Sequence, residues 1–158
     1  MVCALSASIC GNETGDSSSM AVLSGHDILY IAHVSTNRRI RLGASVGTRF
    51  PAYATSLGKV LLAFQDDAAI DDYLASADLV RLTEHTITSA PELRKRLRQA
   101  RTQGYDSAQD ELDYGIVSVA VPVFDKERQI AAAINCSTST TRLSPDGLVA
   151  TPLPLLQH

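Results

Sequence analysis

The chain has 158 residues, of which 45% are hydrophobic and 20% charged, a composition typical of one soluble globular domain. Its net charge of −3 argues against a surface that mainly neutralises nucleic-acid phosphates, and no apolar run approaches the roughly 20 residues that span a membrane. Three cysteines without Cys-x-x-Cys spacing argue against a disulfide framework or a structural zinc site and favour a reducing cytoplasm.

The N-terminal third predicts a linker remnant followed by strands. Residues 1–18 end in the turn-forming run GNETGDSSS, and we interpret them as the remnant of an N-terminal linker helix, with the domain proper at 19–158. Residues 20–23 and 28–34 are β-rich runs around Ser-Gly-His-Asp, which predicts a hairpin with a four-residue loop. Residues 39–42 alternate charged and apolar side chains and predict a third strand.

A glycine-rich loop then runs into an amphipathic helix that we expect from about Thr55 onward. Pro51 before it lacks an N–H group, and the first helical amides, including those of Ser56 and Leu57, have no carbonyl partner within the helix. These amides and the helix dipole would suit a small carboxylate, although a simple cap at Thr55 or Ser56 explains the same residues. The apolar residues recur at the spacing of one helical face: Leu57, Val60, Leu61 and Phe64.

Two further helices are indicated by their caps. Asp66 is expected to cap the first, whose apolar side contains Ile70, Tyr73 and Leu74. The second spans 89–104, because Ser89 and Glu92 have capping-box spacing and Gly104 would end it. No aromatic residues are interleaved with its basic side, so we interpret that side as a solvated face: Arg94, Lys95, Arg96, Arg98 and Arg101.

Residues 116–124 and 130–138 flank Asp-Lys-Glu-Arg and predict an antiparallel hairpin. Because side chains alternate, one face is bulky, with Ile130 among its residues. The other, which we call the small face, would either line a pocket for a small polar ligand or look to water. The small face carries Ser118, Ala120, Ala133, Asn135 and Ser137. A final helical stretch begins at Ser144-Pro145.

Evidence for catalysis or a metal centre is weak. Glu111 and Asp113 could serve as acid and base, but we interpret them as exposed carboxylates beside a turn. No nucleophile elbow, phosphate loop or dinucleotide fingerprint occurs. The histidines, His26, His33, His85 and His158, lack metal-ligand spacing. We therefore expect no enzyme activity, no metal and no cofactor.

Several segments together resemble the C-terminal effector-binding domain of IclR-family transcriptional regulators, especially the subgroup that responds to protocatechuate or hydroxybenzoate. They occur in family order: AVLSGHDILYIAHV, GTRFPAYATSLGKVLLA, SAPELRKRLRQARTQGYD, DELDYGIVSVAVPVFD and IAAAINCSTSTTRLS. The resemblance implies an α+β fold with a twisted antiparallel sheet flanked by helices, as in GAF and profilin-like sensors. It also implies a homodimer or tetramer that reaches DNA only through a winged helix-turn-helix domain absent from this chain.

The resemblance implies a pocket for a small-molecule carboxylate effector, formed by Ser56, Leu57, Ala108, Gln109, Ser118, Asn135 and Ser137. Many relatives have an acidic residue at 108 or 109 and arginine at 117 and 33, where this chain has Ala108, Gln109, Val117 and His33. An aromatic carboxylate is the expected effector. The alternatives are a short acid such as glyoxylate or pyruvate, a small enzyme acting on a carboxylate, and a purely structural oligomerisation module. We expect Asn135→Leu to weaken effector binding and to spare the unliganded fold.

Overall fold

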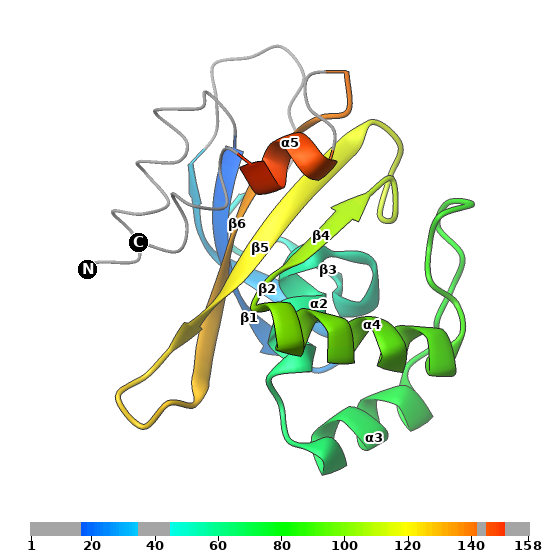
Figure 1. The fold of residues 1–158 in the computed structure, drawn as a ribbon, viewed down its shortest axis with the longest axis vertical. Coiled ribbons are helices and arrows are strands. Elements are labelled where there is room, and N and C mark those ends of the chain that lie inside the picture. Colours follow the sequence, from blue (N-terminus) through cyan, green and yellow to red (C-terminus); the bar gives the residue numbers. More distant parts are fainter. Residues whose placement is uncertain (1–16, 35–44, 142–144, 151–158) are drawn as a thin grey trace.

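The computed structural model describes residues 17–34, 45–141 and 145–150. Within them, an antiparallel sheet has the strand order β3-β2-β1-β6-β5-β4, and helices lie on both of its faces (Figure 1). The predicted α+β class is confirmed. The strands are β1 (Ser17–Ser24), β2 (Asp27–Val34), β3 (Arg49–Pro51), β4 (Asp106–Gln109), β5 (Ile116–Phe124) and β6 (Ile130–Ser139). The helices are η1 (Ala52–Ala54), α2 (Ser56–Ala63), α3 (Asp67–Ser76), α4 (Ala90–Gln103) and α5 (Pro145–Ala150).

The hairpin of β1 and β2 is confirmed, but its loop is shorter than expected. Ser24 pairs with Asp27, which leaves a two-residue turn in which Gly25 has a φ of 62°, a conformation that glycine adopts without strain. Strand β1 begins at Ser17, inside the range 1–18 that we interpreted as a linker remnant. The rest of that range and the strand expected at 39–42 lie outside the described residues.

Helix α2 forms the centre of the core. Its expected start is confirmed, and Thr55 is its cap. All of its residues are buried, because it contacts β5 and β6 on one side and α4 on the other. An amphipathic helix would leave its polar side to water, so this part of the expectation is wrong: Lys59 is fully buried. The burial of Lys59 requires partners for its charge inside the protein.

A glycine allows the chain before α2 to pack closely against it. A Cβ atom at Gly58 would lie 2.1 Å from the carbonyl oxygen of Ala52 in η1, far inside van der Waals contact. Glycine therefore lets η1 fold back onto the first turn of α2. This contact places Ala54 and Thr55 beside the first amides of the helix.

Helices α3 and α4 begin where their caps predict, and α4 ends before Gly104 as expected. Asp66 Oδ1 accepts a hydrogen bond of 2.8 Å from the Ala69 amide, and Ser89 caps α4. Gly104 follows α4 with a φ of 84°. The buried side of α4 packs in the core, and α3 lies beside α4 at one end of the molecule (Figure 1). That buried side consists of Leu93, Leu97 and Ala100.

The hairpin of β5 and β6 has the two predicted faces. The small face packs under α2, with Ala120 and Ala133 fully buried, so the alternative that it looks to water is excluded. The bulky face forms a second core below α5. One residue departs from the pattern: a bulge between Val123 and Phe124 pairs Phe124 with Ile130 and brings Ile130 to the α2 side. No helix of the described residues is long and apolar enough to cross a membrane.

Candidate functional site

A small cavity lies where the start of α2 meets the small face and the loop between β4 and β5. Its volume is about 30 Å³, room for one or two water molecules. Six of the residues predicted for the site line this cavity: Ser56, Leu57, Ala108, Ser118, Asn135 and Ser137. The structure thus brings together positions that are up to 81 residues apart in the chain, from Ser56 to Ser137.

Gln109 is the predicted site residue that does not line the cavity. It is exposed and pairs with Val117, whereas its neighbour Ala108 pairs with Ser118. Because side chains alternate along a strand, Ala108 faces the cavity and Gln109 faces away. Val117 is buried in the second core under α5. The departures from the family pattern at 109 and 117 therefore lie on the sheet face that turns away from the cavity.

At the start of α2, beside the cavity, two backbone amides have no partner among the described residues. Thr55 Oγ1 accepts from the Gly58 amide at 3.0 Å, and the Thr55 carbonyl accepts from the Lys59 amide at 3.0 Å. Nothing in the described part of the chain accepts a hydrogen bond from the amides of Ser56 and Leu57. A cap and free donors thus coexist, and the free donors stand at the positive end of the helix dipole.

The polar side chains of the small face differ in their availability to a ligand. The hydroxyls of Ser56 and Ser118 are 2.7 Å apart and bond to each other. Asn135 Oδ1 accepts a hydrogen bond of 2.9 Å from the Ser19 amide, which ties β6 to β1. Within the described residues, the Ser137 side chain has no hydrogen bond, so its hydroxyl is available. Asn135 therefore has a structural partner, and this contact argues against the expectation that its loss would spare the unliganded fold.

Tyr30 of β2 completes the polar wall, and His33 lies behind it. Burial raises the pKa of the Tyr30 hydroxyl, while hydrogen bonds to the Ser19 and Asn135 side chains oppose the rise. The rings of Tyr30 and His33 are stacked with centroids 6.2 Å apart, and His33 Nδ1 is 2.8 Å from Ser19 Oγ. Burial also lowers the pKa of His33, which favours the neutral imidazole. His33 does not line the cavity itself.

A buried cluster of four charged side chains adjoins the cavity. Lys59 Nζ lies 2.5 Å from Glu111 Oε2 and 3.2 Å from Asp106 Oδ2, and Arg96 Nε donates to Asp106 Oδ1 at 2.8 Å. The Lys59 and Asp106 side chains are fully buried, the Glu111 side chain is 9% exposed and the Arg96 side chain is 30% exposed. With all four ionised, their charges sum to zero, as a buried cluster requires.

The sequence reasoning missed this cluster. It interpreted Glu111 as an exposed carboxylate and Arg96 as part of a solvated face, and both interpretations are wrong. Arg96 also donates to the carbonyl of Ser107, which holds α4 against β4. One signal was available: Lys59 is the only charged residue in the apolar helix 56–64. A lone charge in a buried helix predicts a buried partner.

Glu111 belongs both to the cluster and to the cavity wall. Burial raises the pKa of its carboxyl group, the Lys59 cation opposes the rise, and the nearby Asp106 adds to it. The Glu111 carbonyl accepts a hydrogen bond of 2.8 Å from Thr86 Oγ1, which fixes the loop between β4 and β5. Leu112 and Asp113 of the same loop also line the cavity. Two acidic residues, Glu111 and Asp113, thus line the same cavity as the start of α2.

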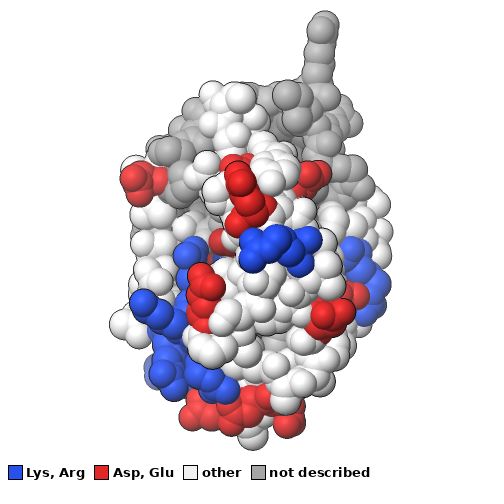
Figure 2. All heavy atoms as spheres, turned by 90° about the vertical axis from the view of Figure 1, so that its right-hand side faces the viewer, with Lys and Arg blue, Asp and Glu red and all other residues white. Residues whose placement is uncertain are grey.

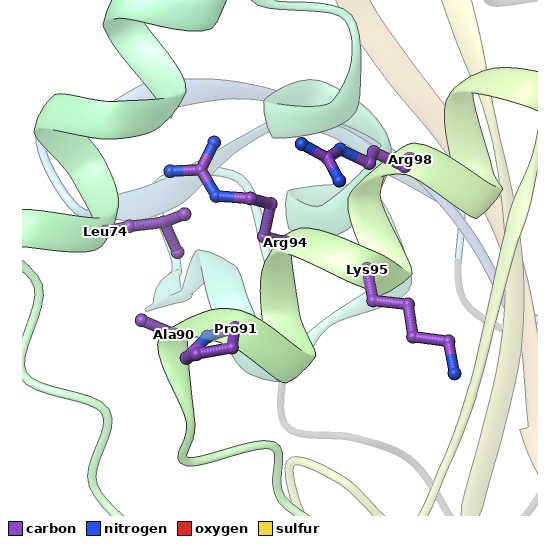
Figure 3. Close-up of a pocket in the computed structure, with 6 residues that line it drawn as sticks. All are labelled: Leu74, Ala90, Pro91, Arg94, Lys95 and Arg98. Atoms are coloured by element: carbon purple, nitrogen blue, oxygen red, sulfur yellow. The ribbon is translucent and has the colours of Figure 1, made fainter.

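A larger and more open hollow lies between α3 and α4. Its volume is about 470 Å³, and it is lined by Leu74 of α3 and by Ala90, Pro91, Arg94, Lys95 and Arg98 of α4 (Figure 3). The Arg94 guanidinium pairs with Asp71 of α3, and Lys95 points away from Leu74. In Figure 2, a group of Lys and Arg side chains at the lower left borders a group of Asp and Glu side chains at the bottom. None of the predicted site residues lies here.

The described residues bring no three His, Cys, Asp or Glu side chains together in an arrangement that could hold a metal ion. Two buried tyrosines use their hydroxyls in the scaffold. Tyr53 of η1 donates to the carbonyl of Val80, and Tyr73 of α3 donates to the carbonyl of His26. His26 Nε2 lies 2.8 Å from Ser76 Oγ, but this hydroxyl donates to the Asp72 carbonyl, so the pair is not an activated nucleophile. The cavity at α2 is therefore the candidate site.

Comparisons with known proteins agree with this geometry. The model of the family described as bacterial transcriptional regulator IclR, C-terminal, matches residues 9–157. The Pca regulon regulatory protein of Pseudomonas putida is 42% identical over 142 residues, which cover 89% of this chain and 49% of that protein. The chain spans about half the length of the curated relatives it matches.

Two solved structures are also similar to this chain in sequence and in fold. A transcriptional regulator of Rhodococcus sp. RHA1 is 38% identical, with a TM-score of 0.94 over 99% of this chain and 63% of that one. The inducer-binding domain of the transcription factor PobR from Acinetobacter, a double mutant in complex with 3-hydroxybenzoic acid, is 31% identical. Its TM-score is 0.91, and the match covers 99% of this chain and 91% of that one.

Proposed function

Because the chain belongs to the IclR family of bacterial transcriptional regulators and forms their C-terminal effector-binding domain, we propose that the cavity at α2 binds an aromatic carboxylate effector. The observation that carries the proposal is that Ser56 and Leu57, whose amides have no acceptor among the described residues, line a cavity together with Ser137. Such amides at a helix start suit a carboxylate. The complex of the PobR domain with 3-hydroxybenzoic acid supports an aromatic acid.

The volume of the cavity favours a second candidate, a short acid such as glyoxylate or pyruvate. About 30 Å³ is far less than the roughly 150 Å³ that takes a benzene ring in an engineered cavity. An aromatic acid would therefore require the wall formed by Leu112 and Asp113 to move outward. A short acid would require less movement.

The remaining parts of the proposal concern the whole protein. Effector binding biases a two-state arrangement, and a separate winged helix-turn-helix domain carries that bias to DNA in the cytoplasm. Self-association as a homodimer or tetramer accompanies it. An enzyme is disfavoured because the family and the relatives that match this chain are transcriptional regulators. A purely structural oligomerisation module would have no use for the free amides of the cavity.

A thermal-shift screen tests this function. The panel contains benzoate, 3-hydroxybenzoate, 4-hydroxybenzoate, protocatechuate, glyoxylate and pyruvate. At about 100 times its Kd, an effector adds roughly 2.7 kcal/mol to the free energy of unfolding, so the melting temperature rises measurably. Shifts with aromatic acids support the first candidate, and shifts with glyoxylate or pyruvate alone support the second.

A pair of variants places the binding in the cavity. Ala108→Leu extends a large side chain into the cavity, whereas Gln109→Leu adds the same side chain on the other side of the strand. We expect Ala108→Leu to abolish the ligand-induced shift and Gln109→Leu to retain it. Equal shifts in both variants would place the effector elsewhere, and no shift with any acid would contradict the proposed function.

A further inference from the structure

The cavity combines groups that attract an anion with a group that repels one. The free amides of Ser56 and Leu57 favour a carboxylate, yet the Glu111 side chain lines the same small space. Two carboxylates that share a buried site cannot both ionise at low cost, because water does not screen their repulsion. The negative charge of an acid bound here must therefore be balanced by a positive charge or by a proton.

The buried cluster has no spare positive charge for the effector. Lys59 and Arg96 balance Asp106 and Glu111, one cation for each anion. An added carboxylate would leave one net negative charge in the interior, and such a charge is costly. Neutrality returns if one of the buried carboxylates accepts a proton.

We propose that Glu111 takes up one proton from solvent when a carboxylate effector binds. The effector stays ionised, the Glu111 carboxyl becomes neutral, and Lys59 keeps its contact with Asp106. The inference rests on the proposed function. It assigns to Glu111 a role in specificity: the cavity accepts an anion together with a proton, and effector affinity falls as pH rises.

Glu111 is better suited to this role than any other titratable group around the cavity. Asp106 of β4 is fully buried, and both of its oxygens already have a cation beside them, Lys59 at Oδ2 and Arg96 at Oδ1. Asp113 in the Glu111 loop is exposed and solvated. Burial raises the pKa of the Tyr30 hydroxyl of β2, so it is already protonated at neutral pH.

Among the described residues, His33 is the main competing proton acceptor. It lies behind Tyr30, is stacked on that ring, and burial lowers its pKa, so it is neutral near pH 7 and could take up a proton when an anion binds. It does not line the cavity, and its Nδ1 is engaged with Ser19 Oγ. Burial raises the pKa of Glu111, by contrast, so this carboxyl group is already poised to accept a proton.

Titration calorimetry in buffers with different heats of ionisation counts the protons taken up. The ligand is the acid of the panel that gives the largest thermal shift, and the matched control is its neutral amide. The titrations are run from about pH 5 to about pH 8. At pH values between the pKa of Glu111 in the unliganded protein and its pKa in the complex, we expect uptake to approach one proton per bound acid. Affinity for the acid should fall by up to about tenfold per pH unit in that window. The amide should bind without proton uptake.

Two variants test which residue takes up the proton. Glu111→Gln keeps an acceptor for Lys59 but cannot titrate, so it should bind the acid without proton uptake and more tightly than wild type at high pH. His33→Gln should take up protons as wild type does. Uptake that persists in Glu111→Gln, or that is lost in His33→Gln, would overturn the assignment.

The number of protons that the wild-type protein takes up tests the inference even if the Glu111→Gln variant does not fold. Binding of the acid with no proton uptake, or equal uptake with the amide, would overturn the inference and leave the proposed function intact. Failure of every acid in the panel to bind would contradict the function itself, and the inference with it.

Discussion

Asn135 shows how one side chain can lie in a cavity and still belong to the scaffold. It lines the candidate site, but its Oδ1 accepts a hydrogen bond from the Ser19 amide of the neighbouring strand. The Ser18 hydroxyl also donates to the Asn135 carbonyl at 2.6 Å. The alternation of side chains along the strand predicted that Asn135 lies on the small face. Its partner could not be predicted, because Ser19 is 116 residues away in the sequence.

The variant Asn135→Leu tests this reading. It leaves the buried Ser19 amide without its acceptor, so we expect the free energy of unfolding of the unliganded domain to fall by about 1 to 3 kcal/mol. Urea denaturation measures this change. Ser137→Ala is the control from the same face, and its loss should be smaller because the Ser137 hydroxyl has no partner among the described residues. Equal losses in the two variants would show that the Ser19 contact is not what matters.

Three elements meet at Lys59. The residue stands on α2, its partner Asp106 begins β4, and Arg96 on α4 holds the other oxygen of the same carboxylate. The cluster therefore fixes α2 and α4 relative to the edge of the sheet. Because Glu111 follows β4 and contacts the same ammonium group, the cavity wall is positioned by the same contacts.

Lys59→Met removes the positive charge that Asp106 and Glu111 share. We expect it to lower the free energy of unfolding by about 3 to 5 kcal/mol, because breaking a buried ion pair leaves its partner uncompensated. Lys95→Met is the matched control, since Lys95 is exposed on α4. Urea denaturation of both variants decides the matter: a loss for Lys59→Met as small as that for Lys95→Met would contradict a structural role for the cluster.

Elements with local signals were predictable. The caps at Asp66 and Ser89 and the glycine after α4 are local features, and the structure confirms the helices that they bound. Strand alternation likewise predicted both faces of β5 and β6. The bulge that moves Ile130 depends on tertiary packing, and so do the identities of the partners of Lys59, which no local pattern records.

For the whole molecule, the arrangement of the layers explains where a ligand site can form. Large side chains fill the core under α5, whereas the small side chains under α2 leave a cavity beside the helix start. The larger hollow between α3 and α4 has basic and apolar walls and lies away from this site (Figure 3). Family membership indicates a sensor, and the amides at the start of α2 are the reason that we propose the cavity beside them as its effector site.

A crystal structure of this chain with the most stabilising acid of the panel tests the location of the site most directly. We predict that the carboxylate accepts hydrogen bonds from the amides of Ser56 and Leu57 and that the rest of the acid lies against Ser137, with the Glu111 side chain beside it. An acid bound instead between α3 and α4, beside Arg94 and Arg98, would contradict the assignment of the cavity at α2 as the effector site.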